Sequence, residues 1–321
     1  MAAGLASDFK PDTEQIWAGY TEVIEQQTDI FNQSSNGAIV LVDEDHAGAY
    51  VYKSFLQAVS GIVARRDVTS LSAVADTGLT MEEEIFVKLK RKIIPLGQTL
   101  DAWKNMKLDP SMMSFLIGQQ VAKAIMKDYV DSVLRAAGPA LYANLPYDRT
   151  AGSMRSEDII SGMALFGDAA SKIACWVMHS TPYFALVKDQ YADAIANVAD
   201  VAIYKGTPAT LGKPVVVCDS PGLVNASPTP DQYYTLGLVE GALIVQESEK
   251  KDIVSEIVTG LENLVNRIQG EYAFSIGVKG FQYDVANGGA NPNDAALITA
   301  TNWDLVSADD KSTAGFCIQS Q

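Results

Sequence analysis

Residues 110–137 read PSMMSFLIGQQVAKAIMKDYVDSVLRAA, and their spacing does most to decide the fold. Apolar side chains recur there at steps of three and four residues, as on one face of an α-helix. The series is Ala122, Ile125, Met126, Tyr129, Val130, Val133 and Leu134. Asp109 is expected to cap this helix, and Gly138-Pro139 to end it. A helix of about 28 residues is roughly 40 Å long, so it should span a domain rather than lie inside one.

The N-terminal region predicts an arm that docks onto a neighbouring subunit. Residues 11–27 have the apolar spacing of an amphipathic helix, with Trp17 and Tyr20 on its apolar face. The polar run at residues 32–37 predicts a linker after this helix. A helix on a polar tether needs a partner for its apolar face, so Trp17 and Tyr20 are candidate intersubunit contacts.

Residues 45–97 are predicted to form an extended ribbon of two strands. Ile85, Val87 and Leu89 alternate with mostly charged neighbours, as on one face of a strand. Isolated two-stranded ribbons are only marginally stable in water. We therefore expect another chain to cover this ribbon.

Two groups of basic residues lie in the ribbon. One is Arg65-Arg66, and the other consists of Lys88, Lys90, Arg91 and Lys92. Acidic residues stand just upstream of the second group, and the chain is acidic elsewhere. Salt bridges between subunits are therefore favoured over nucleic-acid binding. Such surface pairs add little energy singly, but they select which partner docks where.

The second half of the chain mixes helices and strands without strict alternation, which indicates an α+β fold. Helices are expected over residues 156–172, 181–190 and 253–268, and strands over 37–43, 173–178, 215–218, 233–245, 272–278 and 316–318.

Composition limits the possible functions. The chain has 321 residues, of which 48% are hydrophobic and 20% charged, as in folded globular proteins. Its formal net charge of -15 argues against a protein that grips nucleic acid, because phosphates require a basic face. No segment reaches the roughly 18 apolar residues of a membrane span, and MAAGLASDFKPD at the start does not resemble a signal peptide.

Residues 206–222 imitate a nucleotide-binding protein. GTPATLGK at 206–213 resembles a phosphate loop, and DSPG at 219–222 resembles a GTPase motif. However, five residues rather than four separate the first glycine from Gly-Lys, and Pro214 stands where Ser or Thr would bind magnesium. The sequence therefore favours no nucleotide and no other cofactor.

Other reactive side chains are scattered. Asp43, Glu44, Asp45 and His46 are metal-ligating types, but consecutive strand residues point to opposite faces, so no metal site is expected. The three cysteines, Cys175, Cys218 and Cys317, are too far apart for a zinc motif. Cys175 with His179 could form a nucleophile pair, although a thiol in a core strand is usually inert. We predict no catalytic residue, and an enzyme using residues 175–222 stays an alternative.

Five segments of the second half follow one another in a characteristic order. They are CWVMHSTPYFALVKDQ at 175–190, LGKPVVVCD at 211–219, YYTLGLVEGALI at 233–244, GFQY at 280–283 and TNWD at 301–304. Their order and spacing resemble the major capsid proteins of tailed bacteriophages, which have the HK97-like fold. The resemblance covers roughly residues 110–321, and the first hundred residues match mainly in shape.

The resemblance implies a division of the chain. It implies an N-terminal arm at 1–36, an extended loop at 45–97, a peripheral domain built from 37–44, 98–140 and 245–321 that contains a long spine helix, and an axial domain at 141–244. It also implies strands over 260–283, which disagrees with the helical spacing at 253–268.

The resemblance further implies a structural protein and not an enzyme. Copies would form the pentamers and hexamers of an icosahedral head that encloses double-stranded DNA without sequence-specific binding. The expected partners are other copies, a scaffolding protein and a portal protein, with a decoration protein as a further candidate. The protein would be assembled in the host cytoplasm and remain in the virion. An encapsulin-like compartment with an enzyme cargo is the alternative with the same fold.

Overall fold

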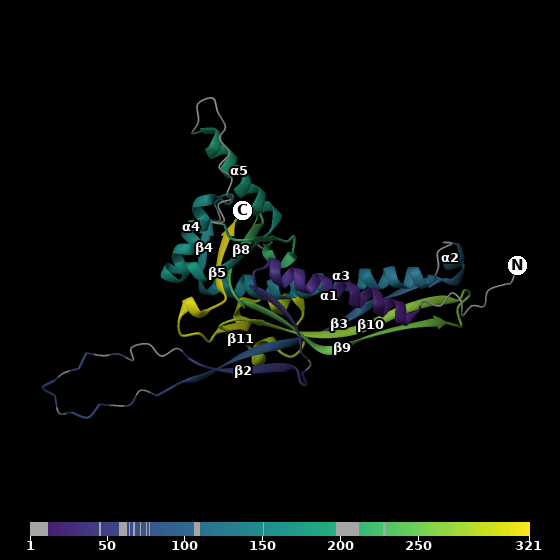
Figure 1. Cartoon of the computed structure of the whole chain (residues 1–321), viewed down its shortest axis with the longest axis horizontal. Helices are drawn as coiled ribbons and strands as arrows, with labels where there is room; N and C mark the ends of the chain where they lie inside the picture. The colour runs from purple at the N-terminus through teal and green to yellow at the C-terminus, as the bar shows by residue number, and fades with distance from the viewer. Residues whose placement is uncertain are drawn as a thin grey trace.

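The computed structural model describes residues 12–44, 46–57, 63, 65–66, 68–70, 72–74, 76, 78–105, 110–149, 151–196, 212–226 and 229–321. The expected cap Asp109, the arm's residues 1–11 and residues 206–211 of the phosphate-loop-like segment lie outside these ranges. Figure 1 shows a long helix, α3, that lies between an upper part with β5 and β8 and a lower part with β3, β9 and β10.

Helix α3 (Pro110–Asn144) has 35 residues and is therefore roughly 52 Å long. The expectation that it ends at Gly138-Pro139 was wrong, because Pro139 lies inside it. A proline inside a helix costs about 3 kcal/mol. Here its neighbours Ala137, Ala140 and Leu141 are fully buried. Their burial offsets the cost and carries the helix on into the upper part.

Helix α1 (Thr13–Ser34) is capped by Asp12 and packs along α3. The predicted helix is present, but it runs through the start of the expected linker. Two glycines allow the close contact. A Cβ atom on Gly118 would lie 2.1 Å from the carbonyl oxygen of Ile16, and one on Gly19 would lie 2.3 Å from that of Phe115. The two backbones therefore touch.

The lower part is a five-stranded sheet with the order β1-β9-β10-β3-β2. Its strands are β1 (Ile39–Asp43), β2 (Tyr50–Leu56), β3 (Met81–Thr99), β9 (Leu243–Val258) and β10 (Val265–Val278). β1 runs parallel to β9, and the other pairs are antiparallel. The predicted ribbon is formed by β2 and the first part of β3, and β3 continues beyond it beside β10.

The predicted helix at 253–268 was wrong. These residues belong to the β9–β10 hairpin, as the resemblance implied. In β9, Ile253 and Ser255 are buried, whereas Val254 and Glu256 are exposed, which is the two-residue period of a strand. The apolar positions fit both periods, and the pairing of β9 with β10, and of β10 with β3, decides for the strand.

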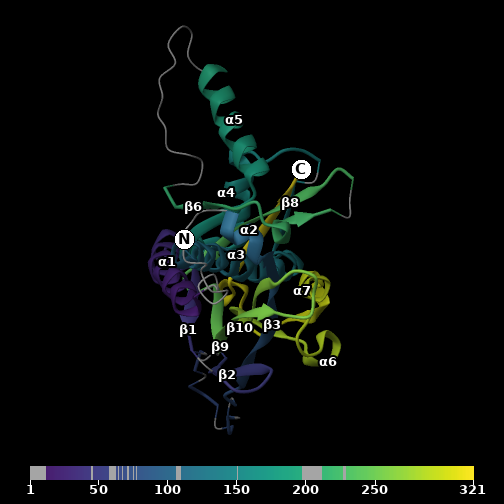
Figure 2. The same ribbon diagram turned by 90° about the vertical axis from the view of Figure 1, so that its right-hand side faces the viewer.

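The upper part is a six-stranded sheet flanked by two helices. Its strands are β4 (Pro146–Arg149), β5 (Ile173–Met178), β6 (Val215–Val217), β7 (Val224–Asn225), β8 (Gln232–Val239) and β13 (Gly315–Ser320). The helices are α4 (Ser156–Leu165) and α5 (Ser180–Ala196). Figure 2 shows α5 rising above the sheet, while β2 extends below the body on the other side.

Three boundaries in this part differ from expectation. The helix expected at 156–172 stops at Leu165, and a 3-10 helix follows from Gly167, whose φ is +54°. The strand expected at 233–245 is broken at Gly241, whose φ is +65°. Residues 315–320 were expected with the peripheral domain, but β13 pairs with β4 and β8.

Shorter elements complete the two parts. They are α2 (Leu100–Asn105), β11 (Phe281–Tyr283), α6 (Val285–Gly288), α7 (Asp294–Ile298), β12 (Trp303–Leu305) and the 3-10 helices η3 (Pro221–Leu223), η4 (Ala300–Asn302) and η5 (Asp310–Ser312). Of these, η3 contacts α3 and β8, and η5 contacts β13. The rings of Tyr283 and Trp303 meet edge to face at 5.3 Å, both buried, so these motif residues belong to the core. Across the described ranges, no helix is long and apolar enough to span a membrane.

Candidate intersubunit surfaces

The ribbon presents apolar side chains to solvent. Val63 and Val74 are 94% and 91% exposed, and Val68 and Leu79 are also exposed. Arg65 and Arg66 lie exposed in the same stretch. In Figure 1 this part of the chain projects at the lower left, away from both sheets. Exposed apolar side chains that gather in one projecting stretch are typical of an interaction site.

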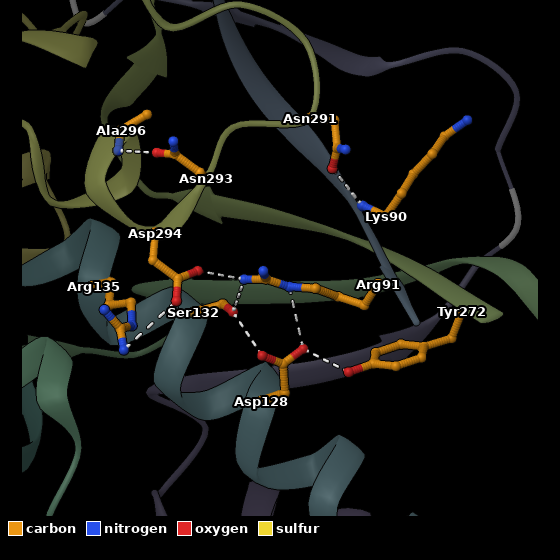
Figure 3. Close-up of polar contacts among 10 residues, drawn as sticks. All are labelled: Lys90, Arg91, Asp128, Ser132, Arg135, Tyr272, Asn291, Asn293, Asp294 and Ala296. Atoms are coloured by element: carbon orange, nitrogen blue, oxygen red, sulfur yellow. Dashed lines mark hydrogen bonds and ion pairs between the residues drawn. The ribbon is translucent and has the colours of Figure 1, made fainter. Parts of the chain in front are cut away.

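Arg91 of β3, in contrast, is used within the chain. Its guanidinium donates to Asp294 Oδ1 at 2.8 Å and lies 3.5 Å from Asp128 Oδ2 of α3 (Figure 3). Burial raises the pKa of Asp294, but the hydrogen bond and charge of Arg91 outweigh burial and hold that pKa below its usual value. Within the subunit, Arg91 therefore joins β3 to α3 and to Asp294, and its intersubunit role stays a prediction.

Further groups complete this cluster. Tyr272 of β10 donates its hydroxyl to Asp128 at 2.7 Å, and Arg135 of α3 lies 3.7 Å from Asp294 (Figure 3). Arg91 also donates to the Ser132 hydroxyl at 3.3 Å. The acidic members Asp128 and Asp294 could not be predicted from the sequence, because they are far apart in it and only the fold brings them together.

Lys88 is also enclosed by its own chain. Its side chain is 3% exposed, and Nζ lies 2.6 Å from Glu249 Oε1. Nζ also donates to the carbonyl of His46. The hydrogen bond from Lys88 lowers the pKa of Glu249. Lys88 therefore links the root of the ribbon to β9 within its own chain, and an intersubunit contact by Lys88 stays a prediction.

Lys90 and Lys92 remain exposed on the sheet. The backbone N–H of Lys90 donates to Asn291 Oδ1 at 2.8 Å, while its side chain points away from the cluster in Figure 3. The two lysines are available to a partner, together with Arg65 and Arg66.

The apolar face of α1 is covered by its own chain. Tyr20 is 4% exposed, and the Nζ atom of Lys251 lies 5.0 Å from the centre of its ring. Burial raises the pKa of Tyr20. Within the subunit, Tyr20 is thus already packed against its own chain, and its role as an intersubunit contact stays a prediction. Trp17 is half-buried and lines a hollow beside α1.

The side chains considered for catalysis do not form a reactive pair. Cys175 is fully buried in β5, and burial raises the pKa of its thiol to about 11. A protonated thiol is a poor nucleophile at neutral pH. His179 Nε2 instead lies 3.5 Å from Asp219 Oδ1 and its ring packs on Tyr233. This arrangement argues against the enzyme alternative.

The residues considered as metal ligands have separate partners. His46 Nε2 lies 3.0 Å from Ser275 Oγ, and Glu44 accepts a hydrogen bond from Gln246. Asp45 lies outside the described residues. The two side chains therefore contact different strands, β9 and β10.

Comparison with known proteins identifies the family. The family model described as "Major capsid protein 13-like" matches residues 8–317. The head structure of Helicobacter pylori bacteriophage KHP40 is similar with a TM-score of 0.56 at 9% identity, covering 89% of this chain and 88% of that one. The capsid of Ralstonia phage GP4 has a TM-score of 0.52 at 11% identity, covering 89% and 87%.

No curated protein sequence matches the chain. At such low identities the solved structures establish the fold, which is the α+β HK97-like fold of phage capsids. The family match spans nearly the whole chain and establishes the membership. This chain belongs to the Gp13-like family of bacteriophage major capsid proteins, whose place is the virion capsid.

Proposed function

We propose that copies of this chain assemble into the pentamers and hexamers of an icosahedral head that encloses double-stranded DNA. The role is structural, and no side chain acts as a catalyst. The single observation that carries the proposal is the ribbon, where Val63, Val68, Val74 and Leu79 are exposed to solvent within the described part of the chain. A neighbouring copy would bury these side chains.

Assembly would use head-to-tail contacts between two different surfaces of neighbouring copies. Such contacts form a closed ring when the rotation from each copy to the next closes on itself. The six-stranded sheet with α4 and α5 would form the axial domain at the ring centre. The five-stranded sheet with α3 would form the peripheral domain. A scaffolding protein, a portal protein and a decoration protein are the further partners we propose. The acidic balance of the chain is compatible with enclosing DNA without gripping it.

The test compares the full chain with a variant in which residues 57–80 are replaced by a short Gly-Ser turn. Velocity sedimentation and electron microscopy of the full chain should show rings and shells. The shortened variant should stay a folded subunit, with the circular dichroism of the full chain. A full chain that remains a monomer even with its scaffolding protein would overturn the proposal.

A second comparison addresses the enzyme alternative. The variants Cys175→Ala and His179→Ala should assemble as the unchanged chain does, because neither side chain lies on the ribbon. Assembly that depends on either group would count against a purely structural role.

A further inference from the structure

A groove runs between α1 and the edge of the five-stranded sheet. It consists of two adjoining hollows of about 260 and 490 Å³. Both hollows are lined by Ile24, Glu25, Asp43 and Glu247, so they form one surface. This surface is called the α1–β9 groove below.

The groove is acidic. Its lining contains five carboxylate side chains, which are Glu25, Asp29, Asp43, Glu247 and Asp252. Two lysines also line it, and the ammonium of Lys251 is already paired with Glu247. The groove therefore has more negative than positive charge within the lining itself and would attract a cationic side chain.

Two tyrosines lie beneath the groove. Tyr20 and Tyr129 line the two hollows and are 4% and 6% exposed. Their buried hydroxyl oxygens lack a hydrogen-bond partner among the described residues. Both hydroxyls lie within electrostatic range of the Glu247 carboxylate. Buried polar atoms are usually paired, so the floor of the groove keeps unused hydrogen-bonding capacity beside a carboxylate.

Arg65 and Arg66 have the matching chemistry. A guanidinium presents several N–H donors in one plane, pairs well with carboxylates and stacks on aromatic rings. The half-buried ring of Trp17 stands at the groove for such stacking. Exposed Val63 and Val68 flank the arginines on the ribbon, and Leu41 and Val42 line the groove. Charge and apolar surface are therefore both complementary.

The two surfaces do not meet within one subunit. In Figures 1 and 2 the ribbon projects away from the body, whereas α1 lies over the opposite end of the sheet beside α3. We propose that Arg65 and Arg66 of one copy dock into the α1–β9 groove of another copy. This inference rests on the proposed assembly function and names the surfaces that perform it.

Directed disulfide formation tests the contact. Subunits carrying Arg66→Cys would be mixed during assembly with subunits carrying Glu25→Cys, both in a Cys218→Ser background; Cys175 and Cys317 are buried. After oxidation, a denaturing gel without reductant should show covalent dimers that contain one copy of each variant. Arg65 and the other four carboxylates remain to guide docking.

The matched control is Gln26→Cys, an exposed neighbour that does not line the groove. Residue 26 lies about 100° further round the helix than residue 25, so the Gln26→Cys variant should give no dimers.

Shells that form without Glu25–Arg66 dimers would overturn the docking inference and leave the assembly function standing. Failure of the unsubstituted chain to form shells would instead reject the assembly function itself. A link from Ala3→Cys to Glu25→Cys within one chain, with no dimers, would assign the groove to the N-terminal segment and overturn the inference.

Charge exchange provides a second readout. Arg65→Glu with Arg66→Glu should raise the concentration needed for assembly by about tenfold or more, as expected for the loss of close charge pairs. Adding Glu25→Arg and Asp43→Arg should recover most of that loss. Glu22→Arg, on the same helix but outside the groove, should recover none. Equal recovery with Glu22→Arg would overturn the placement.

Discussion

The side chain of Arg91 joins three elements of the fold. It connects β3 to α3 and to α7 through Asp128 and Asp294. We expect Arg91→Ala to lower the free energy of unfolding by about 1–3 kcal/mol, because two partly buried carboxylates lose their cation. Urea denaturation of the unassembled subunit measures this loss. Lys90→Ala is the matched control and should change stability by no more than about 0.5 kcal/mol. Equal losses would contradict the cluster's role.

His46 predicts a dependence on pH. Burial lowers its pKa, and the nearby charge of Lys88 lowers it further. A histidine whose pKa is lower in the folded chain binds fewer protons there than in the unfolded chain, where its pKa is about 6.5. Stability should therefore fall as the pH drops from about 7 through that value towards the folded pKa. His46→Gln should flatten this part of the profile, measured by urea unfolding across pH. An unchanged slope would contradict the assignment.

The basic residues of β3 show what sequence alone could supply. Alternation placed Lys88, Lys90 and Lys92 on one face of a strand and Arg91 on the other, and β3 is a strand. The burial and pairing of Lys88 and Arg91 could not be predicted, because they depend on Glu249 and Asp294. Those two residues lie in distant segments of the chain, and no local sequence pattern indicates that they are partners.

The contact between α1 and α3 is the clearest feature at the scale of elements. A side chain at Gly118 would meet the backbone of Ile16, which cannot move aside as a flexible side chain could. We expect Gly118→Ala to destabilise the subunit by about 1–3 kcal/mol, despite alanine's better helix propensity. Thermal unfolding measures it. Gly78→Ala has open space around the added methyl group and should be nearly neutral. A stabilised Gly118→Ala subunit would refute the close contact.

Local sequence patterns predicted some helices and strands of this chain correctly and others not. The core of α3 was predicted because its apolar residues keep one period, and the strands β1, β5 and β13 were predicted because each contains a short apolar run. The β9–β10 hairpin was mistaken for a helix because its apolar residues fit both periods. The end of α3 was misplaced because burial around Pro139 outweighs the local penalty of proline. The α1–β9 groove was beyond prediction, since its carboxylates come from three separate segments.

At the scale of the whole molecule, the net charge of -15 predicts how assembly depends on salt. Copies with the same charge repel one another over about 30 Å at 0.01 M salt but only about 8 Å at 0.15 M. Assembly should therefore become faster as salt rises across this range, as measured by light scattering. The docked arginine pairs are close and partly enclosed, so they should be screened less. Assembly that slows steadily across the range would contradict a dominant net repulsion.

The interleaving of the two sheets has a consequence for the rate of folding. β1 pairs with β9 through Ile39 and Leu243, and β13 completes the other sheet beside β4. Neither sheet can close until distant parts of the chain have found each other, and such pairings fold in milliseconds to seconds rather than microseconds. During that delay the strand edges stay open to mispairing with other newly made chains. The yield of assembly-competent subunits in a cell would then depend on the rate of folding and on how well chaperones protect the open strand edges.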